Sequence, residues 1–293
     1  MNLMKITNFK NLPESIVRAI TFDDYSKGTA DISVTSLWKS PRVVELETKF
    51  ADQITQDASE MIWVLFGKSI HEILRRSDDT ALTETRLSAN ILDMKVSGQF
   101  DRFVEKDGLL QDYKITSAWT LVFDSKHKDW TNQLNSYAHL LRKQGHKVTK
   151  LEVVAILRDW SAREARTKPD YPQSPVQVIS LDLWSDDKTQ GLLEDQVKKH
   201  TEGKLKLPLC TAEEQWSKPT VYAVMKEGRK SALSLCMTQD QANKEKEGLG
   251  HEHGVNKVYI DVRKGEKTKC ESYCSVKKFC SQYADERLIL AMP

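Results

Sequence analysis

Two aspartates and a lysine lie close together in the stretch GQFDRFVEKDGLLQDYKITSAW, which runs from Gly98 to Trp119. They are Asp101, Asp112 and Lys114. Carboxylates held close together repel each other unless a cation lies between them, and hard oxygen ligands favour Mg²⁺ or Mn²⁺. A lysine beside them can hold a water or hydroxide nucleophile and offset negative charge that develops on a phosphate. The stretch is therefore a candidate site for metal-assisted chemistry.

The same stretch has the pattern of two strands joined by a tight turn, because an Asp-Gly pair is a strong hairpin signal. A two-residue turn at Asp107-Gly108 places Asp101 opposite Lys114, with Asp112 two residues along. A four-residue loop, Glu105–Gly108, pairs Asp101 with Asp112 directly. Either loop puts the three side chains on one face. The alternative interpretation is a solvated face with an Asp–Lys cross-strand pair.

Other segments supply the elements that must carry this hairpin. Apolar residues recur at helical spacing from about Ala51 to Arg76, although Gly67 is expected to break or bend that helix. A second helix is predicted from about Thr131 to Gln144. The segments KLEVVAIL and VQVISLDLW are predicted as strands, the first of them buried. With 39% hydrophobic residues in 293, the chain can form a sizeable core.

Composition and pattern exclude several classes of protein. The longest apolar run, Met61 to Phe66, is far shorter than the ~20 residues of a membrane helix. The first residues lack the apolar segment of a signal peptide, so we expect a cytoplasmic protein without membrane contact. The segment FGKSIHE resembles the end of a P-loop, but position 62, where a glycine is required, holds Ile62. No nucleoside triphosphate site is expected, and any motor would be another protein.

The charge is nearly balanced, with 44 basic and 42 acidic residues and a net charge of +2. Basic residues nevertheless gather between Arg142 and Lys150 and between Arg263 and Cys280. Such patches suit a polyanion such as nucleic acid. A solvated charged surface is the alternative for either patch.

Four segments in order resemble the active-site motifs of the PD-(D/E)XK nuclease superfamily, and in particular its RecB-type exonuclease branch. They span about Gly67 to Leu141. The segments are GKSIHEIL with His71, GQFDRF with Asp101, QDYKITS with Asp112 and Lys114, and NQLNSYAHLL with Gln133 and Tyr137.

The resemblance implies a fold and an activity. The fold would be α/β, a restriction-endonuclease-like core in which helices flank a central mixed sheet. The activity would be that of a Mg²⁺- or Mn²⁺-dependent deoxyribonuclease, an exonuclease similar to single-chain enzymes of bacteriophages, acting on DNA in processing or recombination. It would work in the cytoplasm of a bacterium or a phage-infected cell, with a recombination or helicase protein as a potential partner.

The resemblance also implies roles for single residues. Asp101, Asp112 and the backbone carbonyl of Tyr113 would bind the metal, and Lys114 would position the attacking water. His71 would be an additional ligand or would orient one, and its alternative is a histidine packed in a helix face.

Two residues of the last motif lie four apart, so they share one helix face. They are Gln133 and Tyr137, which in the family steady the site and the DNA. A packed tyrosine beside a surface glutamine is the alternative.

Three of the five cysteines, Cys270, Cys274 and Cys280, lie within eleven residues, which indicates metal binding. A closed tetrahedral site needs a fourth ligand. Cys210 is the first choice. The alternatives are Cys236, His251 and His253.

RecB-type nucleases with an iron–sulfur cluster also end in three closely spaced cysteines, so the resemblance favours a [4Fe–4S] cluster, with Zn²⁺ as the alternative. This chain departs from them, because their fourth cysteine precedes the nuclease core, often just ahead of a proline. Here Ser40 stands at the comparable place and no cysteine precedes Cys210.

The composition changes near EGKLKLP, which predicts two domains. Residues 1–205 would form the nuclease core with an N-terminal helical lead-in, and residues 206–293 a small α+β region held by the cysteines. Two other functions are compatible with parts of the sequence. One is a DNA-binding or scaffolding module that keeps the nuclease fold without turnover, and the other is a zinc-stabilised protein-interaction module. The intact set of Asp101, Asp112 and Lys114 favours the enzyme.

Overall fold

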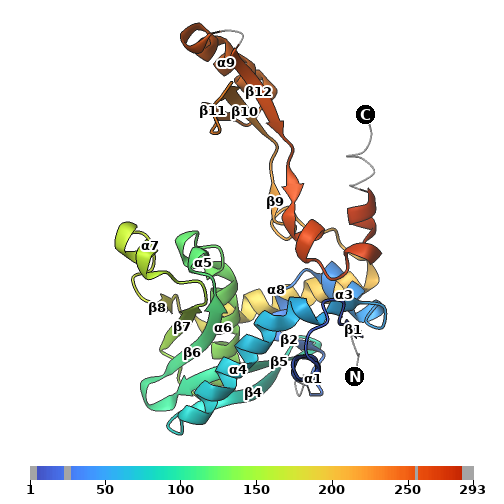
Figure 1. The fold of residues 1–293 in the computed structure, drawn as a ribbon. Coiled ribbons are helices and arrows are strands. Elements are labelled where there is room, and N and C mark those ends of the chain that lie inside the picture. The colour runs from blue at the N-terminus through green and yellow to red at the C-terminus, as the bar shows by residue number, and fades with distance from the viewer. Residues whose placement is uncertain (1–4, 23–27, 255–256, 286–293) are drawn as a thin grey trace. The chain divides into compact units, whose positions relative to one another are not determined.

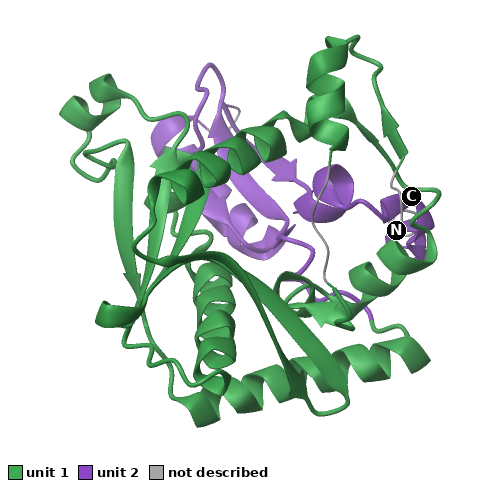
Figure 2. Cartoon of the chain, turned by 90° about the horizontal axis from the view of Figure 1, so that it is seen from below, with its two compact units in different colours: residues 1–208 green, residues 209–293 purple. Residues whose placement is uncertain are grey.

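The computed structural model describes residues 5–22, 28–254 and 257–285. The chain divides into two compact units, Met1–Pro208 and Leu209–Pro293 (Figure 2). Each unit has its own hydrophobic core. Within the described ranges, no helix has the length and apolarity to span a bilayer.

Unit 1 is built on a mixed six-stranded sheet, which confirms the predicted α/β fold with a central mixed sheet and is consistent with a restriction-endonuclease-like core. The strands follow the order β2-β5-β6-β7-β8, and β4 pairs with β5. β6 and β7 are parallel, whereas β5 is antiparallel to both β4 and β6. Their bounds are β2 (Ile32–Ser33), β4 (Leu82–Ile91), β5 (Met94–Val104), β6 (Leu109–Thr116), β7 (Lys150–Leu157) and β8 (Val176–Leu181).

Helices flank the sheet (Figure 1). In the view of Figure 1, α4 crosses in front of the strands and α6 lies behind them. α6 is the most deeply buried helix, because Leu134, Ala138 and Leu141 join the core formed by the strands. The helices are α1 (Glu14–Thr21), α2 (Val34–Leu37), α3 (Pro41–Lys49), α4 (Ile62–Ser77), α5 (Ala118–Val122), α6 (His127–Lys143), α7 (Ala162–Thr167) and α8 (Asp186–Leu205).

The helix predicted from Ala51 begins eleven residues later, at Ile62 of α4. The preceding residues form β3 (Thr55–Asp57), which pairs with β1 (Lys5–Thr7), and a 3₁₀ turn, η1 (Ala58–Met61). This pairing with a distant part of the chain overrides the helical periodicity. Gly67 does not break the helix and lies within α4.

The hairpin between β5 and β6 adopts the longer of the two loops considered. Phe103 pairs with Leu110 and Val104 with Leu109. The loop is a 3₁₀ turn, η2 (Glu105–Asp107), followed by Gly108 with φ of 61°. A glycine suits this position because the left-handed backbone is costly for other residues. The same register, continued by one pair, puts Asp101 across from Asp112.

Unit 2 contains a three-stranded antiparallel sheet of order β11-β10-β12, on which α9 packs. Its small core includes Val224, Cys236, Ala242 and Val258. The elements are β9 (Ser217–Lys218), β10 (Val221–Lys226), β11 (Ser234–Cys236), α9 (Gln239–His253), β12 (Val258–Arg263), β13 (Glu266–Lys267), a π turn η4 (Lys269–Tyr273) and a 3₁₀ turn η5 (Lys277–Phe279).

Candidate active site

The predicted site lies where β5 and β6 part. Their backbone pairing runs from the loop only as far as Arg102 and Gln111. At the next position a side chain takes over, because the Tyr113 N–H donates to Asp101 Oδ2 over 2.6 Å. A buried backbone N–H needs such a partner once its strand neighbour has gone. The parting of the strands thereby fixes the Asp101 carboxylate.

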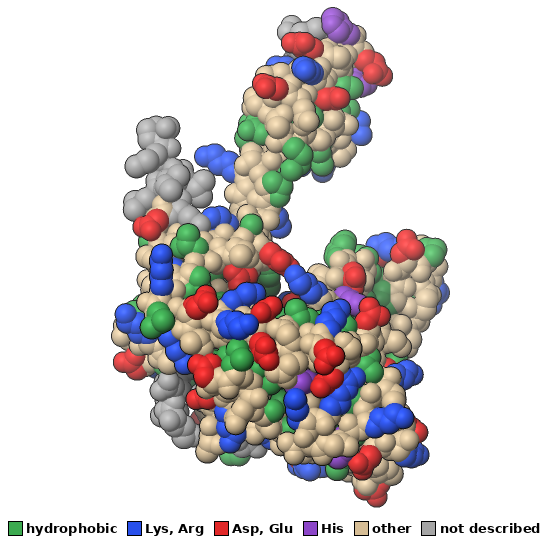
Figure 3. All heavy atoms as spheres, turned by 180° about the vertical axis from the view of Figure 1, so that it is seen from behind, with side chains coloured by type: hydrophobic (Ala, Val, Ile, Leu, Met, Phe, Trp, Pro, Cys, Tyr) green, Lys and Arg blue, Asp and Glu red, His purple; other side chains and the backbone are tan. Residues whose placement is uncertain are grey.

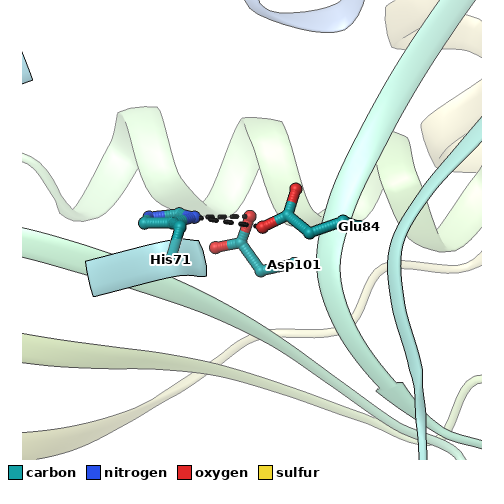
Figure 4. A group of neighbouring side chains, drawn as sticks. All are labelled: His71, Glu84 and Asp101. Carbon is teal, nitrogen blue, oxygen red and sulfur yellow. Dashed lines mark hydrogen bonds and ion pairs between the residues drawn. The ribbon is translucent and has the colours of Figure 1, made fainter. Parts of the chain in front are cut away.

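His71 on α4 reaches the same place and contacts three oxygens, of which those of Glu84 and Asp101 are drawn in Figure 4. Its Nε2 lies 3.2 Å from the Tyr113 carbonyl oxygen, and its Nδ1 lies 3.3 Å from Glu84 Oε1 and 3.5 Å from Asp101 Oδ1. Burial lowers the pKa of His71, but hydrogen bonds to Asp101 and Glu84 outweigh it and raise this pKa to about 10. An imidazolium donates from both nitrogens, which matches these contacts.

Glu84 is a site residue that the sequence interpretation missed. Thr83 pairs with Arg102 and Thr85 with Phe100, so Glu84 lies across from Asp101. Its backbone has φ of 46°, a conformation uncommon for residues other than glycine. Gln99 Nε2 donates to Glu84 Oε2 over 2.8 Å and holds the carboxylate in place.

A signal for Glu84 was present in the sequence. The segment LTETRLSANI, β4 in the structure, alternates in polarity like a strand from Leu87 to Ile91. Only Leu92 and Asp93 separate it from β5, so a hairpin register would have placed Glu84 opposite Asp101.

Asp112 and Lys114 form an ion pair beside this group, between Oδ2 and Nζ. Asp112 is buried, and burial together with the charge of Asp101 raises its pKa to about 6 despite Lys114. Burial lowers the pKa of Lys114, but the charges of Asp112 and Asp101 more than compensate and raise it. Lys114 is therefore an ammonium at neutral pH.

These donors could hold a divalent cation. One ligand atom each from His71, Glu84 and Asp101 lie within 4.8 Å of one another, in the part of the chain that the structure describes. Asp112 is not one of these three, but the charge of Asp101 acts on it and helps to raise its pKa. Carboxylate and carbonyl oxygens with a single histidine suit Mg²⁺ or Mn²⁺ better than a soft metal.

Gln133 and Tyr137 pair with each other, since Gln133 Nε2 donates to Tyr137 Oη over 2.8 Å. The Tyr137 ring is buried against Gly98 of β5, where a Cβ would come within 2.6 Å of Cε1. The tyrosine thus supports the strand that leads to Asp101. The predicted role of both residues toward DNA stays a prediction.

The cysteines lie in unit 2. The backbone of Cys210 is hydrogen-bonded to Gln282, which lies close in sequence to Cys280. The Cys210 N–H donates to Gln282 Oε1 over 2.8 Å, and Gln282 Nε2 donates to the Cys210 carbonyl over 3.0 Å. Gln282 follows Cys280 by two residues. Cys236, by contrast, is buried in the core under α9.

No protein-family model and no curated protein matches the chain. Two solved structures are similar to parts of it. A protein named SSO0001 has a TM-score of 0.44 and 15% identity over 69% of this chain and 87% of its own. A phage-related exonuclease from Haemophilus somnus 129PT has a TM-score of 0.30 and 12% identity over 56% of this chain and 71% of its own. Similarities this low carry no conclusion about activity.

Replacing Glu84 by glutamine should weaken the binding of Mn²⁺, by the ~10–100-fold that is typical when a residue supporting a metal site is lost. Isothermal titration calorimetry measures this affinity. Glu72→Gln is the matched control, because Glu72 lies on the exposed side of α4 and pairs with Arg75 and Arg76. Equal affinities for Glu84→Gln and the wild type would contradict a role for Glu84 at the metal.

The stability of the metal-free protein should fall as the pH rises from about 6 to 10. Because the pKa of His71 is raised, this residue contributes its full stabilisation of the fold below about pH 6.5. The stabilisation is lost as the pH rises through about 10. The raised pKa of Asp112 acts in the same direction at lower pH, because the cost of ionising this buried carboxyl develops between the ordinary pKa of 3.8 and about 6. A divalent cation competes with these protons, so Mg²⁺ should raise the melting temperature more at pH 9 than at pH 6.

Thermal unfolding with Mg²⁺ and with EDTA at both pH values tests this expectation. His71→Gln should show a weaker dependence on pH in EDTA. Equal Mg²⁺-induced shifts at pH 6 and pH 9 in the wild type would argue against proton competition at this site.

Proposed function

We propose that this protein is a divalent-metal-dependent deoxyribonuclease of the PD-(D/E)XK superfamily, of the RecB exonuclease type. One observation carries the proposal. Ligand atoms of His71, Glu84 and Asp101 converge where two strands part, and the ion pair of Asp112 with a protonated Lys114 lies beside them. This arrangement combines donors for a hard cation with a positive group for a phosphate.

The cation would be Mg²⁺ or Mn²⁺, held by Asp101, Asp112 and the Tyr113 carbonyl, with His71 and Glu84 completing the donor set. When bound, such an ion supplies Lewis acidity and lowers the pKa of a water molecule. The chain's own contribution is to hold these donors in register. Asp101 is fixed by the Tyr113 N–H, and Glu84 is fixed by Gln99.

Lys114 acts as a hydrogen-bond donor and not as a base, because its pKa is raised above the ordinary lysine value. Its ammonium orients the attacking water and offsets charge on the phosphate. The water oxygen would form a bond to phosphorus and release a proton to solvent, while the bond to one bridging oxygen breaks and that oxygen takes up a proton from solvent. The Asp112 carboxylate keeps the ammonium in place.

The experiment that tests this function uses purified protein on end-labelled linear DNA and on closed circular DNA. With Mg²⁺ or Mn²⁺ the linear DNA should be degraded from its ends while the circle survives, and EDTA should stop the reaction. Cleavage of the circle would indicate an endonuclease. If both DNAs survive, the non-catalytic DNA-binding or scaffolding module becomes the better account.

Lys114→Met should lower kcat by about 10²–10³-fold, as is typical when a preorganised donor to a developing charge is removed. The affinity for Mn²⁺ should change little, because the ammonium is not a ligand. Lys198→Met is the matched control, since Lys198 is an exposed residue of α8 that pairs with Asp195. Thermal unfolding checks that the variant is folded, and near wild-type hydrolysis by folded Lys114→Met would refute the assignment.

We further propose that Cys210, Cys270, Cys274 and Cys280 hold one metal centre, a [4Fe–4S] cluster, with Zn²⁺ as the alternative. Thiolate donors suit both. The contacts between Cys210 and Gln282 support the choice of Cys210 over Cys236. Closing the loop between Cys210 and Cys270 would reduce the entropy of the unfolded chain, and so stabilise a unit whose own core is small.

Anaerobically purified protein should be brown and contain iron and sulfide if the centre is a cluster, or be colourless and contain zinc otherwise. Cys210→Ala should lose this metal, whereas Cys236→Ala should keep it because Cys236 is a core residue. Folded protein with neither iron nor zinc would exclude the centre. Full metal content in Cys210→Ala would make Cys236, His251 and His253 the next candidates.

A further inference from the structure

Exposed aromatic side chains lie on the two helices that lead into the candidate active site. Trp63 and Phe66, which are 57% and 40% exposed, lie on α4, the helix that carries His71. Trp119 and Phe123, which are 41% and 71% exposed, lie on and just after α5. α5 begins four residues after Lys114. Large aromatics gathered on a surface mark a binding site more often than scattered ones do.

Arg158 contacts a ring of α4 and is held by its backbone near the start of α5. Its guanidinium lies 4.8 Å from the centroid of the Trp63 ring. The backbone N–H of Arg158 donates to the Thr116 carbonyl over 2.9 Å. The side chain of the neighbouring Asp159 accepts from the Ala118 N–H over 2.7 Å. Arg158 is therefore anchored at the start of α5 while its side chain covers the tryptophan of α4.

The rings on α5 are held in place by packing. Trp119 and Phe123 stack with centroids 5.9 Å apart and planes 23° apart. Trp119 also meets the buried Tyr171 edge-on at 5.8 Å, and Lys168 Nζ lies 5.2 Å from the Trp119 ring. Because these side chains are already held in place, they lose little conformational entropy when a planar group stacks on them. Lys168 shares its charge with Glu164, so Arg158 is the main cation here.

We call this surface the aromatic platform; its members are Trp63, Phe66, Trp119, Phe123, Arg158 and Lys168. We propose that the platform binds unpaired bases of single-stranded DNA, beside the phosphate that the metal site would cleave. The inference rests on the proposed nuclease function and names its substrate class. Aromatic rings favour this ligand because they stack on the exposed face of an unpaired base. A base within a duplex has both faces covered by its neighbours and cannot stack on a side chain.

Position and charge support a single strand as the occupant. Trp63 precedes His71 by eight residues of α4, or about 12 Å along the helix axis, a distance that a few nucleotides can span. A cation beside aromatic rings suits phosphate and base together. A duplex would favour a continuous basic surface, whereas Arg158 is the main cation beside these rings. On the side turned away from the viewer in Figure 1, acidic and basic side chains are interspersed (Figure 3).

Fluorescence anisotropy in EDTA tests the proposal without cleavage. The probes are a labelled oligothymidine and a labelled blunt duplex of the same length. The wild type should bind the single strand at least about 10-fold tighter than the duplex. Trp119→Ala should weaken single-strand binding by about 10-fold and leave duplex binding unchanged. Phe22→Ala is the matched control, because Phe22 is as exposed as Phe123 and lies at the end of α1.

Trp119 packs on Tyr171, so Phe123→Ala serves as a second variant that disturbs the fold less. Loss of single-strand binding in either folded variant supports the platform. Equal affinity of the wild type for both probes, or unchanged binding in Phe123→Ala, would overturn it. These results are independent of hydrolysis. If the protein cleaves DNA but fails the binding test, the proposed function stands and the platform is refuted. If it binds the single strand without cleaving DNA, the platform stands and the proposed function is refuted.

Discussion

Three carboxylates crowded into one partly buried place are the constraint on which this structure depends. Glu84, Asp101 and Asp112 repel one another, and removal from water makes the repulsion stronger. The chain balances them with two cations of its own, His71 and Lys114. The cost shows at Asp112, whose pKa is raised by burial and, after burial, by the charge of Asp101. A divalent cation bound among these carboxylates would offset their mutual repulsion.

The surrounding elements serve this balance. β5 and β6 separate at the site, and the backbone of Tyr113 then finds its partners in Asp101 and His71. α4 brings the histidine across the sheet, and the left-handed backbone of Glu84 turns its carboxylate inward. Tyr137 packs on Gly98 and supports β5 from α6. The same two helices that border the site, α4 and α5, carry the exposed rings.

Local signals made part of this arrangement predictable. The Asp-Gly pair predicted the hairpin, its loop alternatives included the observed register, and KLEVVAIL is β7 residue for residue. The start of α4 was placed too early because the pairing of β1 with β3, about 50 residues apart, competes with helical periodicity. Glu84 was missed for a local reason, because the hairpin of β4 with β5 that sets it opposite Asp101 was not predicted.

The most direct test is anomalous diffraction from crystals soaked in Mn²⁺. The account predicts a manganese peak bonded to oxygens of Asp101 and Asp112, with Glu84 or His71 also among its ligands. Lys114 should remain next to Asp112 and should not contact the ion. A peak absent from this cluster at saturating Mn²⁺, or found only elsewhere on the protein, would contradict the claim that these carboxylates are held together to bind a metal.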